Sequence, residues 1–137
     1  MSQNKAVIIH TSTCEEGWDD DVHGRLRWRT LISADESTPT EALTTGVAEI
    51  SPGDQLNVHS HTPAEVYYIL AGTGEIVIDG ESSLVKSGTA IYIPSNALHS
   101  LKNTGKTLLR LFYVFAVDTF AEVDYFFPEN SHPQGLD

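Results

Sequence analysis

Apolar and polar residues alternate along much of the chain, in short segments separated by turn residues. Residues 25–31 alternate strictly, which places Leu26 and Trp28 on one face of a strand and three arginines on the other. From residue 43 onward, short apolar segments recur between turns that contain glycine, proline or asparagine. The strand segments expected on this basis are residues 7–9, 25–31, 43–50, 66–70, 75–79, 84–85, 90–93, 99–101 and 108–117. Many short strands joined by such turns favour a closed barrel or a jelly roll.

The segments between these strands are expected to be turns and loops. Acidic residues at positions 15, 16 and 19–21 indicate a solvated loop, and residues 35–41 form a polar loop. Asp79 followed by Gly80 is a hairpin signal. Residues 119–122 have the form of a capping box, which predicts a single helical turn.

Length and composition indicate one globular domain. A chain of 137 residues, 40% of them hydrophobic, is long enough to bury a core. We expect a single domain over residues 1–137, with its core at about residues 43–117 and a loose tail at 129–137. No long apolar run occurs, and the N-terminus lacks the apolar region of a signal peptide, so a soluble cytoplasmic protein is expected. Cys14 is the only cysteine, which rules out an internal disulfide and a cysteine-based metal site.

The charge balance bears on possible partners. Asp and Glu number 19 against 8 Lys and Arg, which gives a formal net charge of −11. Nucleic acids and anionic membranes are poor partners for so acidic a surface, and neither is expected to bind.

Three histidines and one glutamate have the spacing of a metal site. His59 and His61 lie two residues apart, and alternate residues share one face of a strand. Glu65 follows closely, and His99 belongs to a later block bounded by turns. Imidazole nitrogen and carboxylate oxygen together suit a divalent transition metal, and the four side chains converge if the two blocks lie on neighbouring strands. The metal is expected to be iron, manganese, nickel, zinc or cobalt. The remaining histidines, His10, His23 and His132, are expected to be surface or loop residues.

The two blocks resemble the two motifs of the cupin superfamily over about residues 45–115. The first motif is matched by Gly53, His59, His61, Glu65 and Gly72, and the second by Gly88, Pro94, His99 and Asn103. Asn96 stands where the family usually has glycine, and asparagine tolerates a left-handed turn best after glycine. The resemblance implies an all-β, jelly-roll-like antiparallel barrel that holds one metal inside. It carries over His59, His61, Glu65 and His99 as the metal ligands.

A closer resemblance extends beyond these motifs. Residues 26–29, 47–53, 61–67 and 121–126 are similar to small marine cupin lyases, which cleave dimethylsulfoniopropionate to acrylate and dimethyl sulfide. The resemblance implies a β-elimination on a small carboxylate substrate. Tyr125 matches a tyrosine near the C-terminus of those lyases and is a second catalytic candidate.

Tyr67 is the main catalytic candidate. It lies two residues after Glu65, so strand alternation points it to the same interior face and points Tyr68 outward. A nearby metal lowers the pKa of a phenol from its usual value of about 10, which suits Tyr67 to the role of a general base. In the lyase interpretation the metal polarises the substrate carboxylate, Tyr67 removes the adjacent proton, and aromatic walls hold the sulfonium by cation–π attraction.

Two other functions remain open. One is a different metal-dependent enzyme acting on a small organic acid, namely a dioxygenase, an isomerase or a decarboxylase. The other is a non-catalytic module that binds a metal or a ligand. In each case we expect a homodimer formed through sheet edges, because open edge strands attract partners.

Overall fold

The computed structural model describes residues 5–10, 14–34 and 40–128, and the strands among them form one antiparallel sheet. Its strands are β1 (Glu16–Asp20), β2 (Gly24–Ile32), β3 (Thr44–Ile50), β4 (Gln55–His59), β5 (Glu65–Ala71), β6 (Thr73–Ile78), β7 (Glu81–Lys86), β8 (Ala90–Ile93), β9 (His99–Asn103) and β10 (Leu109–Phe115). One 3-10 turn, η1 (Phe120–Glu122), follows β10.

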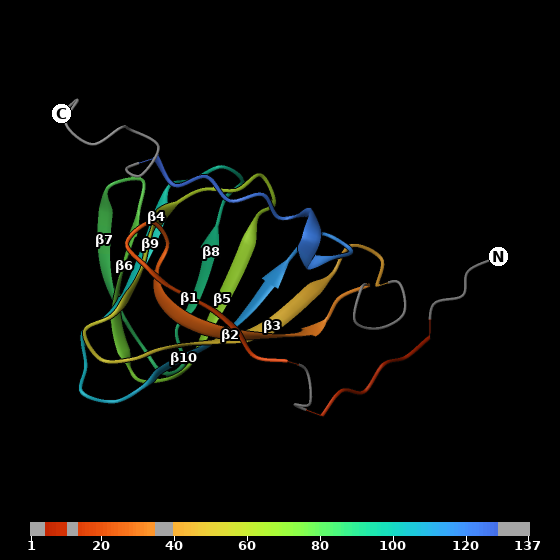
Figure 1. Ribbon diagram of the computed structural model, residues 1–137, viewed down its shortest axis with the longest axis horizontal. Coiled ribbons are helices and arrows are strands. Elements are labelled where there is room, and N and C mark those ends of the chain that lie inside the picture. Colours follow the sequence, from red (N-terminus) through yellow and green to blue (C-terminus); the bar gives the residue numbers. More distant parts are fainter. Residues whose placement is uncertain (1–4, 11–13, 35–39, 129–137) are drawn as a thin grey trace.

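The sheet curls around a central core, as Figure 1 shows. Its strand order is β7-β6-β9-β4-β2-β3-β10-β5-β8, with β1 paired to β2 outside this path. Strands β7 and β8 stand at the two ends of the order and do not pair with each other. The all-β antiparallel architecture expected from the sequence is therefore confirmed, as a curled sheet that is open between its end strands.

Period-2 alternation decides which side chains enter the core. Strand β2 buries Leu26 and Trp28, while Arg25 and Arg27 are exposed, as the sequence predicts. Strand β5 buries Tyr67 and leaves Tyr68 44% exposed, also as predicted. Strand β10 buries four residues in the same way, namely Leu109, Leu111, Tyr113 and Phe115.

Two predictions for the N-terminal region are wrong. Residues 7–9 do not form a strand, and Ile8 is 96% exposed. The acidic segment, expected to be a loop, contains β1, which pairs with β2 in the register Glu16↔Trp28. Acidic side chains of this segment meet arginines of β2, as in the 2.9 Å contact from Arg25 Nε to Asp19 Oδ1. The local sequence suggests a solvated loop because it contains only the acidic side chains. The arginines that neutralise them lie on β2 and are not visible in the segment itself.

The turns follow the sequence more closely. Asp79 and Gly80 link β6 to β7 with φ values of 48° and 85°, which is the positive-φ pair of a tight hairpin. Asn96 has a φ of 65°, so it adopts the left-handed conformation expected of it. The turn η1 is the predicted helical turn, in which the backbone N–H of Thr119 donates to the Glu122 carboxylate at 3.2 Å.

Two further points concern the extent of the domain and membrane-spanning helices. The tail expected at 129–137 lies outside the described residues, and a single domain over residues 1–137 stays a prediction. Among the described residues, no helix has the length and apolar character that a membrane span requires.

Candidate metal centre

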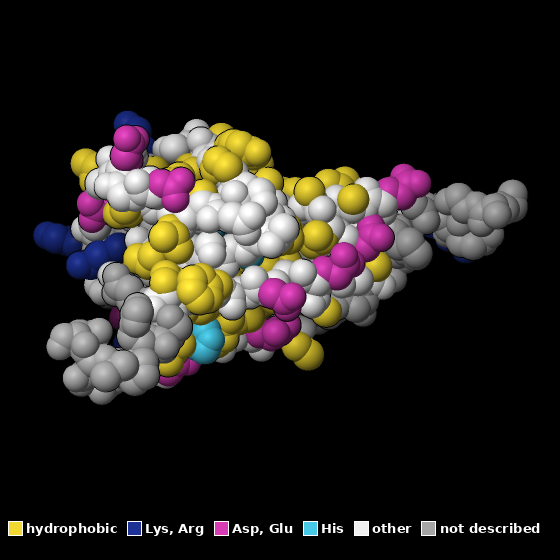
Figure 2. All heavy atoms as spheres, turned by 90° about the horizontal axis from the view of Figure 1, so that it is seen from above, with side chains coloured by type: hydrophobic (Ala, Val, Ile, Leu, Met, Phe, Trp, Pro, Cys, Tyr) yellow, Lys and Arg dark blue, Asp and Glu magenta, His cyan; other side chains and the backbone are white. Residues whose placement is uncertain are grey.

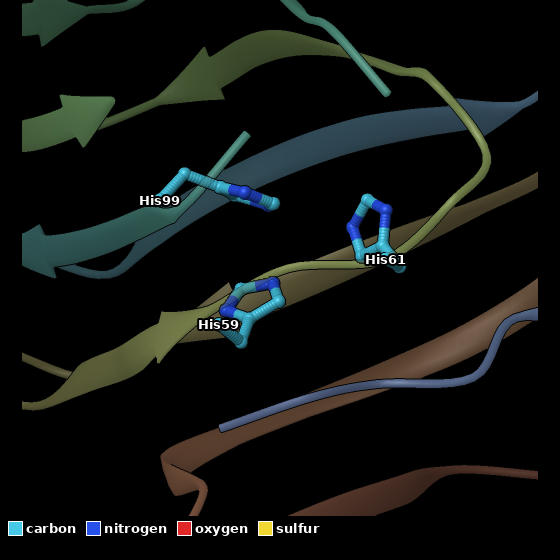
Figure 3. A group of neighbouring side chains, drawn as sticks. All are labelled: His59, His61 and His99. Atoms are coloured by element: carbon cyan, nitrogen blue, oxygen red, sulfur yellow. The ribbon is translucent and has the colours of Figure 1, made fainter. Parts of the chain in front are cut away.

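Three buried histidines meet inside the sheet, as Figure 3 shows. His59 ends β4 and His99 begins β9, and the two are Cα partners in the antiparallel pair. His61 lies just beyond the end of β4 rather than within the strand. One nitrogen from each of the three rings lies within 4.8 Å of the others. The two sequence blocks therefore do lie on neighbouring strands and bring these histidines together.

Backbone carbonyls orient each of the three rings. His59 Nδ1 lies 2.7 Å from the carbonyl oxygen of Asn57, and His61 Nδ1 lies 2.9 Å from that of Pro63. His99 Nδ1 is held in the same way, 2.9 Å from the carbonyl oxygen of Ala97. A carbonyl oxygen only accepts hydrogen bonds, so each Nδ1 carries the proton and each Nε2 presents a lone pair. Hydrogen bonds of this kind, from the ring nitrogen that does not coordinate, hold metal-binding histidines in orientation.

The Nε2 atoms are suited to a metal ion. Those of His59 and His99 are buried and have no hydrogen-bond partner among the described residues. An unpaired buried nitrogen is unfavourable, and coordination to a cation satisfies it. The donor set therefore fits a divalent transition metal.

Glu65 supplies a carboxylate to the same place. It begins β5, is 5% exposed, and its Oε1 lies 3.1 Å from His61 Nε2 and 3.6 Å from His99 Nε2. An oxygen facing two Nε2 lone pairs needs a proton or a metal ion between them. The structure thus brings together all four residues that the sequence analysis singles out as ligands.

Burial and the Glu65 carboxylate act differently on two of the histidines. Burial lowers the pKa of His59 well below its usual range, and the nearby His99 lowers it further. Burial also opposes protonation of His61, but the hydrogen bond and charge of Glu65 outweigh it and raise the pKa of His61. Without a metal, His61 is therefore the histidine that Glu65 favours in its protonated form.

The two candidate catalytic tyrosines both line a mainly apolar cavity next to His59 and Glu65. Tyr67 is 3% exposed, and its ring centroid lies 6.3 Å from that of His99. The Tyr125 ring lies 5.5 Å from His59 and 5.4 Å from His61, so this residue does reach the histidines. Burial raises the pKa of both phenols well above the usual value, and the negative charge of Glu65 adds to the effect. Without a metal, both phenols therefore hold their protons more strongly than a free tyrosine does.

Aromatic side chains from distant segments form the rest of the cavity wall. Trp18 of β1 lies 4.8 Å from Trp28 and 5.2 Å from Tyr125 between ring centroids. Phe120 lies 6.0 Å from Trp28 and 6.3 Å from Tyr125. Trp18 and Phe120 were not singled out from the sequence. The one sequence feature that could have indicated Trp18 is that an aromatic residue interrupts the acidic segment.

Among the described residues, His10, His23 and the arginines do not belong to the converging group of histidines. His10 is exposed, and His132 lies outside the described residues. His23 occupies the turn between β1 and β2, where its ring stacks on Trp18 at 4.3 Å. Arg27, Arg29 and Arg110 pair with Glu15 and Glu49 on the outer surface.

Several known proteins are similar to this chain in sequence and in fold. The family model described as "Cupin domain" matches residues 46–115. Dimethylsulfoniopropionate lyase DddW of Ruegeria pomeroyi is 41% identical over 111 residues, which cover 81% of this chain and 72% of that protein. The oxalate-binding protein of Thermotoga maritima is 34% identical over 67 residues, 48% of this chain and 55% of that protein.

Solved structures add evidence on the fold. A predicted oxalate decarboxylase from Thermotoga maritima superposes with a TM-score of 0.71 at 23% identity, covering 81% of this chain and 99% of that one. A chain from crystal structures of DMSP lyases gives a TM-score of 0.61 at 18% identity, covering 73% of this chain and 51% of that one. At such identities the likeness concerns the fold alone.

Proposed function

The chain belongs to the cupin family, and we propose that it is a metal-dependent carbon–sulfur lyase acting on a small carboxylate substrate such as dimethylsulfoniopropionate. The observation that carries this proposal is the 41% identity to the lyase DddW over 81% of the chain. The converging imidazole and carboxylate groups support it, because such a reaction needs a Lewis acid next to the substrate carboxylate.

In this proposal His59, His61, Glu65 and His99 hold one divalent ion of iron, manganese, nickel, zinc or cobalt. The bound ion supplies Lewis-acid polarisation of the substrate carboxylate and a positive charge that opposes the raised pKa of the Tyr67 phenol. The donor set alone does not select one metal, since the same ligands accept several.

Tyr67 acts as the base in the proposed reaction. Its phenolate oxygen takes the proton from the carbon next to the substrate carboxylate. The electron pair of that C–H bond becomes the new C=C bond, and the C–S bond breaks with its pair remaining on sulfur. The products are acrylate, neutral dimethyl sulfide and a protonated Tyr67. Tyr125, close to His59 and His61, is placed to act as a second phenol in the same cavity.

The aromatic wall suits the positive end of such a substrate. Trp18, Trp28 and Tyr125 present ring faces and edges within one mainly apolar cavity. A sulfonium held against aromatic rings gains about 0.5–2 kcal/mol from cation–π attraction. Loss of the charge as dimethyl sulfide forms weakens that attraction, which favours release of the product.

Two alternative functions are kept beside the lyase. The similarity to a protein described as an oxalate-binding protein supports these alternatives, namely a different metal-dependent enzyme acting on a small organic acid and a non-catalytic binding module. A cytoplasmic location, a homodimeric state and the absence of nucleic-acid and membrane partners also belong to the proposal.

The test is a substrate assay on protein reconstituted separately with each candidate metal. Dimethylsulfoniopropionate is added, acrylate and dimethyl sulfide are quantified by chromatography, and oxygen is followed with an electrode. We expect equal amounts of the two products and no oxygen uptake. Metal-loaded protein that releases neither product contradicts the lyase proposal. Oxygen uptake with other organic acids then supports a dioxygenase, and tight binding without turnover supports a binding module.

A further inference from the structure

Residues 119–127, the C-terminal strap, follow β10 and return to the segment that carries two of the candidate ligands. The N–H of Ser60 donates to the carbonyl oxygen of Phe126, and the N–H of Phe126 donates to the carbonyl oxygen of Ser60, both at 2.9 Å. Ser60 stands between His59 and His61 in the chain. Figure 1 shows the strap, in blue, along the upper end of the curled sheet. The strap is therefore fastened to the segment whose side chains meet in the candidate metal centre.

Alternation along the strap sets which of its side chains face inward. Phe126 is 53% exposed, whereas Phe127 is buried and Tyr125 is partly buried. An extended segment points alternate side chains to opposite sides, so the bridge at Phe126 turns Tyr125 and Phe127 toward the histidines. Figure 2 views the molecule from the side of the strap and shows hydrophobic side chains along this face, with Lys and Arg at its margins. Apolar packing and the backbone bridge therefore hold this part of the strap.

Phe127 packs against both the candidate metal centre and the wall of the cavity. Its ring stacks on that of His59, with centroids 5.2 Å apart and planes inclined by 29°. It also stacks on the Tyr125 ring, at 6.2 Å. Its other ring neighbours belong to the β1–β2 hairpin, namely His23 at 4.8 Å and Trp18 at 5.7 Å. Trp18 and Tyr125 line the cavity, whereas Phe127 is not among the described residues that line it. An effect of Phe127 on a bound substrate must therefore pass through its neighbours.

We propose that Phe127 is a positioning residue, which holds the Tyr125 ring against the candidate metal centre and steadies the ring of His59. The effect on Tyr125 rests on the proposed function, in which Tyr125 is the second phenol. The effect on His59 rests only on the candidate ligand set. When His59 is fixed by coordination, Phe127 has a rigid ring to stack on, and the strap is restrained. Thermodynamic linkage requires the converse, so a loosened strap weakens metal binding.

Metal affinity tests the contact between Phe127 and His59 without any substrate. Titration calorimetry with zinc alone is expected to show an affinity about tenfold lower in Phe127→Ala, within the usual range of coupling between two sites. Phe127→Leu keeps an apolar side chain but has no ring to stack, so its affinity should lie between those of Phe127→Ala and the natural protein. Phe126→Ala, at the exposed neighbouring position, is the matched control and should bind zinc normally. Circular dichroism checks that each variant is folded. A folded Phe127 variant that binds zinc as tightly as the natural protein overturns the proposal.

Hydrogen exchange followed by NMR tests the same coupling from the strap. Zinc is expected to slow exchange of the Phe126 amide at least about fivefold in the natural protein, and less in Phe127→Leu. Amides of β7, at one end of the strand order, are the control and should exchange at the same rate with and without zinc. A Phe126 amide that exchanges equally fast in both states overturns the coupling. Protein that meets both expectations but releases no dimethyl sulfide contradicts the lyase proposal alone.

A double-variant cycle tests the contact between Phe127 and Tyr125. In protein saturated with metal, Phe127→Leu should lower kcat for dimethylsulfoniopropionate more than it raises KM. If Phe127 acts through the Tyr125 hydroxyl, the loss of kcat should largely disappear in a Tyr125→Phe background. A merely structural role of Phe127 would give the same loss in both backgrounds. Equal losses therefore overturn the role of Phe127 in positioning Tyr125.

Discussion

His59 and His99 face each other as Cα partners across β4 and β9, with ring centroids 4.1 Å apart. Both side chains are 1% exposed, and neither Nε2 has a hydrogen-bond partner among the described residues. This register decides the geometry of the candidate site, because a shift of one residue would turn a side chain to the opposite face of the sheet.

Replacement of a facing histidine is expected to remove metal binding. Changing a residue that hydrogen-bonds to a metal ligand typically lowers metal affinity by about 10–100-fold. Removal of a ligand itself, as in His59→Asn, should therefore lower the affinity by at least about 100-fold. Titration calorimetry with the metal alone measures the change, and His10→Asn, at an exposed position, is the matched control. Equal affinity in His59→Asn and the natural protein would remove His59 from the ligand set.

Substitution of Tyr67 tests the proposed base separately from the metal. Tyr67→Phe is expected to lower kcat for dimethylsulfoniopropionate by about 10²–10⁴-fold, the usual contribution of a general base, with metal content unchanged. Tyr68→Phe, the neighbouring residue on the outer face, should retain the natural rate. Full activity of metal-loaded Tyr67→Phe would show that another group removes the proton, and Tyr125→Phe is then the next variant.

Alkaline solution is expected to destabilise the metal-free protein. Burial raises the pKa of Tyr67, Tyr113 and Tyr125 in the folded state. The unfolded chain gives up these protons near pH 10, while the folded chain keeps them. Stability is therefore fully present below about pH 10 and falls as the pH rises above it, through the raised pKa values of the folded state.

Urea unfolding at about pH 8 and about pH 11 measures this loss, and phenolate absorbance follows the ionisation. Tyr113→Phe removes one of the three groups, so its free energy of unfolding should fall less over the same interval. A free energy of unfolding that is independent of pH across this range would contradict the prediction.

Asn103 is expected to stabilise the fold rather than to take part in chemistry. Its side-chain amide donates to the carbonyl oxygens of Ile50 and Thr107 at 2.8 Å each, and its Oδ1 accepts from the N–H of Gly105 at 2.9 Å. Asn103→Ala leaves these buried groups without partners and should lower the free energy of unfolding by about 2–4 kcal/mol. Urea unfolding compares it with Lys102→Ala, at the exposed neighbouring position, for which little change is expected.

Sequence alone determined the inward and outward faces of the strands and singled out the histidines, whose convergence depended on the pairing of β4 with β9. Alternation is a local property, so Leu26, Tyr67 and Tyr113 could be placed in the core without knowledge of their neighbours. The family motifs singled out Glu65 and the histidines because those positions carry chemistry-bearing residue types at a recognisable spacing. Their role as ligands and that of Tyr67 as base stay predictions.

The tertiary structure decided what depends on pairing between distant segments. The sequence analysis missed β1 because its acidic residues resemble a solvated loop. Only the pairing with β2 shows that arginines of that strand neutralise them. The sequence-based description of the aromatic cavity wall was incomplete for the same reason. Trp18 reaches the cavity only because β1 pairs with β2, and Tyr125 reaches it only because the chain returns to the cavity after β10. Residues 7–9 show the converse: their sequence favours a strand, but they pair with no strand of the described residues. Strand propensity is a property of the local sequence, whereas pairing requires a free edge within reach.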